Sequence, residues 1–337
     1  MRPALRSRAI LGLSAALVIA CSGGSASGPP SASAPLASVA GVPSSSASDS
    51  IPSPSPTPGP SDVVVGGDRP VTVLVPASYN PGRPAPLLIM LHGYGSSGSE
   101  HEAYFHVGAR AEERGFLYAY PDGTTDSTGA RFWNATDACC DFDRSGVADD
   151  AYLAGVITAI QTKLAVDPKR VYLMGHSNGG FMSYRMACVH ADQIAAIVSL
   201  AGATFAKPAD CAPSSAVAVL EIHGTADDII LFAGGTIEGI GSGKQMASYP
   251  GAEGTVSDWA TYDGCGATPS VANARIDVDA GLRDAGSPAE ASVTQWTGCK
   301  PGGAVELWTI PGGAHDPTIS DTFPNAVLDF LEAHPKP

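Results

Sequence analysis

One serine of the chain lies in a sequence pattern that can produce a nucleophile. Residues 175–179 read Gly-His-Ser-Asn-Gly, which places Ser177 in a G-x-S-x-G motif. The motif follows the apolar run "RVYLMG" and precedes a helix-like segment that opens with Asn178 and two glycines. In this strand-turn-helix context the motif forms a nucleophile elbow, and the glycines leave room around a strained serine. We therefore predict that Ser177 is a nucleophile, in preference to a passive serine in a glycine-rich turn.

A serine hydroxyl at its ordinary pKa needs a general base, and that base needs an orienting carboxylate. In chains with this elbow the order is serine, then Asp or Glu, then His. His190, His223, His315 and His334 are the histidines downstream of Ser177. His315 lies in a glycine-rich loop after the last strand-like run, so it is the predicted base. His190 ends a helical segment, His334 lies in the C-terminal tail, and His223 precedes the candidate acids.

The candidate acids lie in "EIHGTADDII", just past the strand-like run 218–224. A carboxylate there could reach the imidazole of His315 and hold its tautomer. Asp227 and Asp228 both satisfy this requirement, and a turn-capping role is the alternative for Asp228. Asp316 is excluded because side chains of adjacent residues do not easily form the required hydrogen bond.

Donors for a developing oxyanion are predicted at two backbone positions. "LIMLHGYGSSG" places Tyr94 in an H-G-rich loop directly after an early strand. The backbone N–H groups of Tyr94 and of Asn178, the residue after the nucleophile, form the expected pair. The alternative is a simple glycine turn, which the place of this loop in the strand order disfavours. We expect the side chain of Asn178 to contribute little.

The elements that must position these residues alternate along the chain. Strand-like apolar runs occur at 71–76, 87–93, 116–123, 170–177, 194–202, 218–224 and 304–312. Helical patterns occur between them, at 100–114, 149–164, 179–190, 255–262 and 320–333. This order predicts one α/β domain with a doubly wound, mostly parallel sheet, whose ligand crevice lies at the carboxyl ends of the strands. The segment 272–296 fits poorly and is predicted to be an irregular insertion or a hairpin.

The charge balance excludes one large class of partners. Asp and Glu outnumber Lys and Arg by 33 to 19, and the net charge is −14. Nucleic-acid binding needs a basic face, and no Lys/Arg cluster occurs beyond the first eight residues. We therefore predict no nucleic-acid partner and interpret the acidic surface as a source of solubility.

The N-terminus is typical of export. Residues 1–21 contain a basic start, a short apolar run and Leu-Val-Ile-Ala before Cys21, which is similar to a bacterial lipobox. We predict a lipoprotein signal peptide acylated at Cys21; an ordinary secretory peptide cut nearby is the alternative. Residues 22–62 are almost wholly Ser, Ala, Gly and Pro and are predicted to be a disordered linker. Residues 63–337 then form an extracytoplasmic domain that meets the membrane only through its anchor.

The other cysteines agree with an oxidising compartment. Six remain after Cys21, and they allow 15 pairings, so spacing alone leaves the connectivity open. No C-x-x-C pair of the zinc-binding type occurs, and we expect neither a metal nor an organic cofactor. The six are Cys139, Cys140, Cys188, Cys211, Cys265 and Cys299.

Together these motifs resemble a known family. "LHGYGSSG", "DPKRVYLMGHSNGGFMSYRMAC", "LEIHGTADDIILFAGG" and "GGAHDP" are similar to the polyhydroxybutyrate depolymerase-like esterases, which overlap with secreted feruloyl and acetylxylan esterases. The resemblance covers the chain after the linker and implies an α/β-hydrolase fold. It places the acid of H-G-T-x-D on Asp227, the base on His315 and the nucleophile on Ser177. One departure is the absence of the Trp that often follows the family's histidine.

The resemblance also bears on the disulfides. The family commonly pairs the cysteines that correspond to Cys265 and Cys299. In the implied fold Cys188 and Cys211 both lie at the bottom of the sheet, so we expect them to pair. Cys139 and Cys140 are then left to form a vicinal bridge in a loop near the site.

We therefore predict a monomeric serine carboxylesterase that acts through an acyl-enzyme. Its expected substrates are polyester oligomers or feruloyl and acetyl esters of plant polysaccharide. A non-catalytic, surface-tethered module that binds glycan or polyester is the alternative from another class, and the complete Ser-Asp-His set argues against it. A serine peptidase is the nearest alternative among enzymes.

Overall fold

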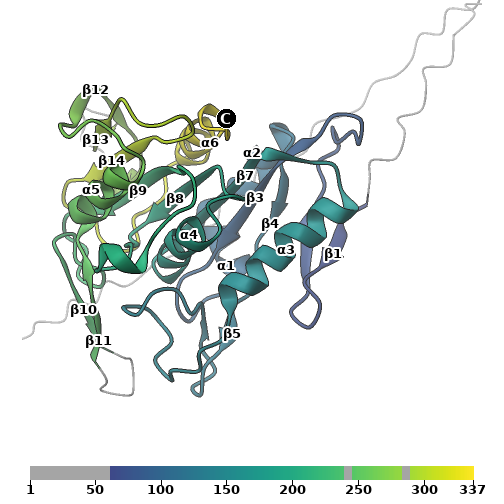
Figure 1. Ribbon diagram of the computed structural model, residues 1–337, viewed down its shortest axis with the longest axis horizontal. Helices are drawn as coiled ribbons and strands as arrows, with labels where there is room; N and C mark the ends of the chain where they lie inside the picture. Colours follow the sequence, from purple (N-terminus) through teal and green to yellow (C-terminus); the bar gives the residue numbers. More distant parts are fainter. Residues whose placement is uncertain (1–60, 239–244, 283–288) are drawn as a thin grey trace, which may run out of the picture. The chain divides into compact units, whose positions relative to one another are not determined.

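A ten-stranded sheet forms the centre of the chain (Figure 1). The computed structural model describes residues 61–238, 245–282 and 289–337. The predicted signal peptide, its Cys21 and all but the end of the predicted linker lie outside the described residues. The strand order in the sheet is β1-β2-β4-β3-β7-β8-β9-β14-β13-β12.

The middle of this sheet is parallel and its two edges are antiparallel. The parallel part consists of β4, β3, β7, β8, β9 and β14. The antiparallel strands are β1 and β2 at one edge and β13 and β12 at the other. The strands are β1 Val63–Val65, β2 Val71–Leu74, β3 Ala85–Leu91, β4 Leu117–Ala119, β7 Val166–His176, β8 Ala196–Leu200, β9 Ala218–Gly224, β12 Ser270–Ile276, β13 Ala291–Trp296 and β14 Val305–Ile310.

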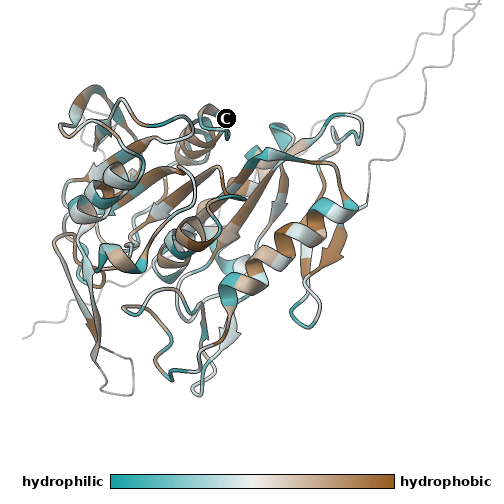
Figure 2. Cartoon of the chain, in the orientation of Figure 1, coloured by the Kyte–Doolittle hydropathy of each residue, from teal (hydrophilic) through white to brown (hydrophobic). Residues whose placement is uncertain are grey.

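Apolar side chains on both faces explain why the central strands are parallel and buried. Every residue of β3 is buried, and alternate side chains enter two different cores. Leu87, Ile89 and Leu91 belong to one core, and Leu88 and Met90 belong to the other. The two-residue period of a strand therefore fills two layers from one continuous apolar run. The strands at the centre are correspondingly brown in Figure 2.

Helices cover both faces of the sheet. α3, α4 and α5 contribute to one core, and α1, α2 and α6 contribute to the other, as a doubly wound fold requires. The helices are α1 Gly98–Phe105, α2 Val107–Glu113, α3 Asp149–Lys163, α4 Asn178–Val189, α5 Ala252–Tyr262 and α6 Phe323–Ala333, with short 3-10 turns at Pro208–Asp210 and Ala280–Leu282. No helix of the described residues is long and apolar enough to span a membrane.

The predicted fold class is confirmed. One predicted helix is corrected, and the segment 272–296 is shown to be a hairpin. All seven predicted strand runs lie on strands of the sheet. The single helix predicted over 100–114 is wrong, because His106 adopts a left-handed conformation (φ 54°) and divides it into α1 and α2. The segment 272–296 contains the hairpin of β12 and β13, which extends the sheet at its edge.

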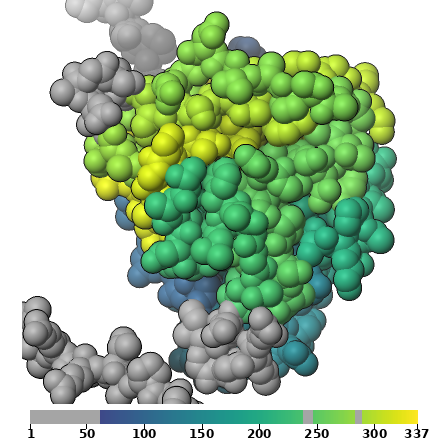
Figure 3. Space-filling view, turned by 90° about the vertical axis from the view of Figure 1, so that its left-hand side faces the viewer, coloured from purple at the N-terminus to yellow at the C-terminus, as the bar shows by residue number. Residues whose placement is uncertain are grey.

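Two small antiparallel pairs were not predicted from the sequence. β5 (Thr124–Thr125) pairs with β6 (Arg131–Phe132), and β10 (Gly234–Glu238) pairs with β11 (Gln245–Pro250). They are separate from the large sheet and belong to the long connections that follow β4 and β9. On the face shown in Figure 3, green and yellow atoms of the C-terminal half make up most of the surface.

Candidate active site

The backbone at Ser177 has the geometry of a nucleophile elbow. Ser177 follows β7, is the N-cap of α4, and has φ 52° and ψ −119°, a conformation that side-chain-bearing residues rarely adopt. A Cβ added at Gly175 would lie 2.2 Å from the carbonyl oxygen of Gly179, and one at Gly179 would lie 2.1 Å from that of Leu91. The strained turn therefore requires glycine at both flanking positions of the motif.

The predicted base and one of the two candidate acids meet in the structure. Nδ1 of His315 lies 2.8 Å from Oδ2 of Asp227. The other carboxylate oxygen of Asp227 accepts the backbone N–H groups of Ile229 and Ile230 at 2.9 and 2.8 Å. Asp228 is exposed, so the carboxylate that faces the imidazole belongs to Asp227.

The electrostatics of Asp227 favour its ionised form. Burial opposes ionisation, but hydrogen bonds from His223 and His315 outweigh it and hold the pKa of Asp227 well below its usual range. An ionised carboxylate accepts the Nδ1–H of His315, which leaves Nε2 of that ring unprotonated and able to take a proton.

His176, the residue before the serine, joins the elbow to the loop of the base. Its Nε2 donates to the carbonyl oxygen of His315 at 3.0 Å, and the two ring centroids are 4.8 Å apart. Within the described residues no hydrogen bond joins Ser177 Oγ to His315. Such bonds are often long before substrate binds and shorten in the complex.

The two backbone groups predicted to bind an oxyanion are available. Gly93 N–H donates to His101 and Gly95 N–H donates to the carbonyl oxygen of Arg131. Tyr94 lies between these two glycines, and Asn178 begins α4. Over the described residues, the N–H groups of Tyr94 and Asn178 donate to no protein acceptor. The N–H of Asn178 also lies in the first turn of α4, where the helix dipole favours negative charge.

The expectation that the Asn178 side chain contributes little is not supported by its contacts. The residue is fully buried; its Oδ1 accepts the N–H of Trp133 at 2.7 Å, and its Nδ2 donates to the carbonyl oxygen of Trp133 at 2.9 Å. Nδ2 also lies 3.5 Å from Sγ of Cys139. Asn178 therefore attaches the loop after β6 to the start of α4, and no local sequence signal indicates this.

Three buried histidines beside the site were not predicted to take part in it. Nε2 of His101 lies 3.1 Å from Nδ1 of His176, and Nε2 of His92 accepts the N–H of Gly123 at 2.9 Å. Burial lowers the pKa of His101 to about 3 and that of His176 to about 4, so both are neutral at pH 7. His101 and His176 link the H-G-rich loop to the loop of the base. In the sequence, only the place of His176 at the first variable position of G-x-S-x-G could have indicated its role.

One group of side chains in the described residues has ligand atoms close enough together for a metal ion. Atoms of His176, His315 and Asp316 lie within 4.8 Å of one another. Nε2 of His176 already donates to a carbonyl, Nδ1 of His315 already bonds to Asp227, and Asp316 is exposed. The donor set is thus committed to hydrogen bonds, and we assign no metal to it.

The structure forms three disulfides, with the pairings Cys139–Cys140, Cys188–Cys211 and Cys265–Cys299. The first lies against the Asn178 side chain and next to the site. The second ties the end of α4 to the loop before β9, and the third ties the end of α5 to the loop before β14. The second and third disulfides thus cross-link segments that are separate in the sequence, whereas the first joins two neighbouring residues of one loop.

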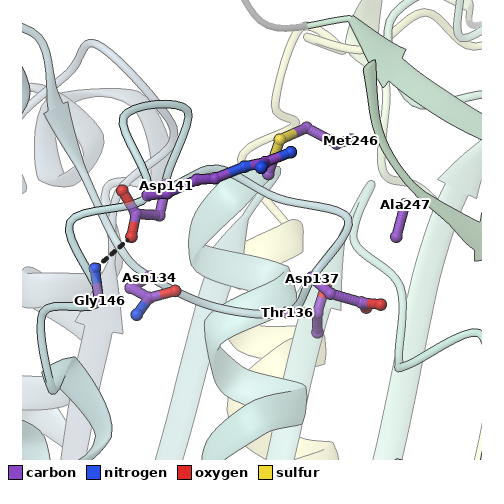
Figure 4. Close-up of a pocket in the computed structure, with 8 residues that line it drawn as sticks. Asn134, Thr136, Asp137, Asp141, Gly146, Met246 and Ala247 are labelled. Carbon is purple, nitrogen blue, oxygen red and sulfur yellow. Dashed lines mark hydrogen bonds between the residues drawn. The ribbon is translucent and has the colours of Figure 1, made fainter. Parts of the chain in front are cut away.

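A pocket lies between the loop after β6 and β11 (Figure 4). Its volume is about 420 Å³, and its wall is formed by the loop after Trp133 and by Met246 and Ala247 of β11. The Ala247 N–H donates to the carbonyl oxygen of Asp137 at 3.2 Å and closes the pocket at that point. The remaining lining residues are polar or small: Asn134, Thr136, Asp141, Arg144 and Gly146.

Comparison with known proteins agrees with the fold. The pattern of the phospholipase/carboxylesterase family matches residues 78–237. Feruloyl esterase B of Piromyces equi is 31% identical over 250 residues, which are 73% of this chain and 42% of that protein. Feruloyl esterase D of Neurospora crassa is 24% identical over 268 residues, which are 76% of this chain and 77% of that protein.

Among solved structures, the acetyl xylan esterase from Aspergillus awamori superposes with a TM-score of 0.56 at 14% identity, covering 81% of this chain and 98% of that one. At such identity the likeness concerns the fold. The chain belongs to the α/β-hydrolase superfamily, and its relatives lie in the esterase family within it. It spans less than half the length of the Piromyces protein.

Proposed function

We propose that this protein is a serine carboxylesterase that hydrolyses feruloyl or acetyl esters of plant polysaccharide, or polyester oligomers, through an acyl-enzyme. One observation carries the proposal: Nδ1 of His315 lies 2.8 Å from the buried carboxylate of Asp227. The loop of His315 is held by a hydrogen bond from His176, the residue before the strained Ser177. The family matches support the same reaction class.

The geometry accounts for each step. His315 Nε2 takes the proton of Ser177 Oγ as the oxygen attacks the ester carbonyl, and Asp227 stabilises the resulting imidazolium. The free N–H groups of Tyr94 and Asn178 bind the tetrahedral oxyanion. The alcohol leaves with the proton from His315. A water molecule, deprotonated in turn by His315, then attacks the acyl carbon. The bond to Ser177 Oγ breaks, His315 returns the proton to Oγ, and the acid is released.

The pocket supports a carbohydrate as the alcohol part of the ester. Its lining offers amide, hydroxyl, carboxylate and guanidinium groups, which suit sugar hydroxyls better than an aliphatic chain. It adjoins Trp133, which Asn178 holds beside the first turn of α4. The names of the relatives, feruloyl and acetyl xylan esterases, favour the same class of ester.

The reaction is tested by hydrolysis of p-nitrophenyl acetate and butyrate. Ser177→Ala is expected to abolish turnover. Ser183→Ala is the matched control, because Ser183 lies on the same helix, is buried, and bonds only to the carbonyl oxygen of Gly179. A fluorophosphonate probe should label wild type and the control but not Ser177→Ala. Full activity of Ser177→Ala refutes the mechanism, and a wild type that the probe does not label favours a non-catalytic binding module.

The substrate is tested by comparing methyl ferulate, acetylated xylan and hydroxybutyrate oligomers. We expect the carbohydrate esters to have the highest kcat/KM. Arg144→Ala is expected to raise KM for a feruloylated arabinoxylan fragment roughly 10-fold, through loss of a charge-assisted hydrogen bond, and to leave p-nitrophenyl acetate unaffected. An equal effect on both substrates would contradict a sugar-binding role for the pocket.

We also propose that the protein works outside the cytoplasm as a monomer, with residues 63–337 as one catalytic domain. The three disulfides suit an oxidising compartment. Palmitate labelling of the wild-type precursor and of Cys21→Ser tests the lipid anchor. Label that persists in Cys21→Ser contradicts acylation at this residue. Light scattering coupled to gel filtration tests the monomer.

A further inference from the structure

A chain of buried polar side chains continues behind the acid of the triad. Tyr184 Oη donates to Oε2 of Glu221 at 2.9 Å, and Oε1 of Glu221 lies 3.0 Å from Nδ1 of His223. Nε2 of His223 lies 3.4 Å from Oδ2 of Asp227. This is the same oxygen that contacts His315 at 2.8 Å. The network thus joins the middle of α4 to the catalytic imidazole.

The network lies in the interior of the molecule. The side chains of Glu221 and Asp227 are 0% exposed and that of His223 is 1% exposed. Glu221 and His223 are two apart on β9, so they point to the same face of the sheet, where α4 packs. Buried ionic groups of this kind are often replaceable by apolar residues without loss of stability. Stability alone therefore gives little reason for such a pair directly behind Asp227.

The hydrogen-bond partners fix the protons of this network. Nε2 of His223 lies 2.7 Å from the carbonyl oxygen of Ile230, so it must carry a hydrogen. Nδ1 faces the carboxylate of Glu221 and shares a second proton with it. Burial alone would lower the pKa of His223, but hydrogen bonds to Asp227 and Glu221 raise it to about 10. Burial raises the pKa of Glu221, so the proton between the two side chains is shared. The Glu221–His223 pair is therefore neutral overall, and its positive end, the His223 ring, faces Asp227.

We propose that His223 is a positioning residue of the triad: its ring lies 3.4 Å from the Asp227 oxygen that orients His315 and attracts that oxygen electrostatically, while the hydrogen bonds to Ile230 and Glu221 keep the His223 ring in place. The proposal rests on the triad assigned above and extends it to groups that do not touch substrate. Because the positive end of the Glu221–His223 pair partly offsets the charge of Asp227, it also reduces the proton affinity of His315. The pair thereby sets the pH at which the base becomes active.

Other groups also face His315, and the test must leave them unchanged. Besides His223 itself, they come from every neighbouring element and comprise Asp227 after β9, His176 on β7, His101 and Tyr104 on α1, and Asp316 on its own loop. His223→Gln removes the positive end of the pair, and Glu221→Gln removes the carboxylate that stabilises the second proton on His223, so the His223 ring loses its charge. Gln at 223 can still donate an N–H toward Asp227 and Ile230 but carries no charge.

The experiment measures the pKa of His315 in two ways in the full chain. Histidine ¹H–¹⁵N NMR follows the ring directly and needs no turnover. The acidic limb of kcat/KM for p-nitrophenyl butyrate follows it through activity, which rises with pH as the base loses its proton. Removal of the nearby positive charge raises the pKa of His315. We expect both variants to shift it upward by roughly 0.5–1.5 units, with kcat reduced about 10-fold and KM within about 2-fold of wild type.

Two further variants separate this effect from a general loss of packing. Asp263→Asn removes a buried carboxylate next to the start of β9, where Asp263 accepts the Val217 N–H, and should leave the pKa of His315 unchanged. Tyr184→Phe removes one hydrogen bond from Glu221 and should shift the pKa of His315 upward by a smaller amount. It serves as the decisive variant if Glu221→Gln or His223→Gln does not fold.

The possible outcomes are distinct. An upward shift with Glu221→Gln, His223→Gln or Tyr184→Phe, absent with Asp263→Asn, supports the proposal. A His315 pKa that equals wild type in every folded variant of the network, or moves equally with Asp263→Asn, overturns it. If wild type has no esterase activity the proposed function fails, and the NMR titration still decides whether the network acts on His315.

Discussion

Replacing Asn178 by Ala tests whether its side chain anchors the loop beside the oxyanion donors. The substitution leaves both the N–H and the C=O of buried Trp133 without their partner. An unpaired buried polar group costs about 1–3 kcal/mol, so two such groups predict a loss of about 2–6 kcal/mol in the free energy of unfolding. At about 2–4 °C per kcal/mol for a domain of this size, Tm should fall by roughly 4–24 °C.

The same change should affect catalysis although the N–H of residue 178 persists. Trp133 and the Cys139–Cys140 loop lose their attachment to the first turn of α4. A displacement of the donor loop by a fraction of an ångström weakens oxyanion binding, and we expect kcat to fall about 10- to 100-fold. KM should change less, because the hydrogen bonds to the oxyanion strengthen only in the transition state.

Thermal unfolding by circular dichroism and steady-state kinetics on p-nitrophenyl butyrate measure these two effects. Asn325→Ala is the matched control, because the Asn325 side chain accepts a hydrogen bond from Arg114 at the partly exposed start of α6. It should lower Tm by no more than about 2 °C. A Tm of Asn178→Ala within 2 °C of wild type together with unchanged kcat would refute the anchoring role.

Three more predictions concern the acid, a disulfide and a buried carboxylate. Asp227→Asn should lower kcat/KM about 10³- to 10⁴-fold through the wrong tautomer of the base, whereas Asp228→Asn should retain nearly full activity in the same assay. Replacing Cys188 and Cys211 together by Ser opens a cross-link between residues 23 apart and should cost about 3 kcal/mol, seen in denaturant unfolding under oxidising conditions. Burial raises the pKa of Asp263 to about 7, so its folded state binds a proton more tightly than the unfolded state. The contribution of Asp263 to the free energy of unfolding should be complete below about pH 4 and should fall by up to about 4 kcal/mol as pH rises to 7. In urea unfolding, Asp263→Asn should reduce this dependence of the free energy of unfolding on pH.

Much of the site could be predicted because its residues follow strands directly. Ser177 follows β7, Asp227 follows β9 and His315 follows β14. In a parallel sheet these carboxyl ends meet at one edge, so chain order and element type were enough to propose the triad. The choice between Asp227 and Asp228 was different. Both follow β9, so their position after the strand did not separate them, and the family resemblance chose Asp227. In the structure the turn directs the Asp227 carboxylate to the imidazole.

The groups that surround the triad could not be predicted in the same way. His101, His176 and Asn178 make contacts with residues 45 to 139 positions away along the chain, and no short-range pattern encodes such distances. The division of 100–114 into α1 and α2 was missed for a related reason. Helical periodicity continues through His106, whose left-handed backbone lets α2 pack against β4 and α6.

By itself, the sequence determined the fold class, the strand order along the chain and the three residues proposed for catalysis, because apolar runs and glycine-bounded motifs act locally. The tertiary structure alone decided what holds Asn178, and that Glu221 and His223 lie behind Asp227. In the sequence, Glu221 and His223 are polar residues within a predicted strand, and nothing there indicates a contact with Asp227. Their chemistry appears only when β9 is buried beneath α4, where water no longer satisfies them and each polar group must find its partner within the protein.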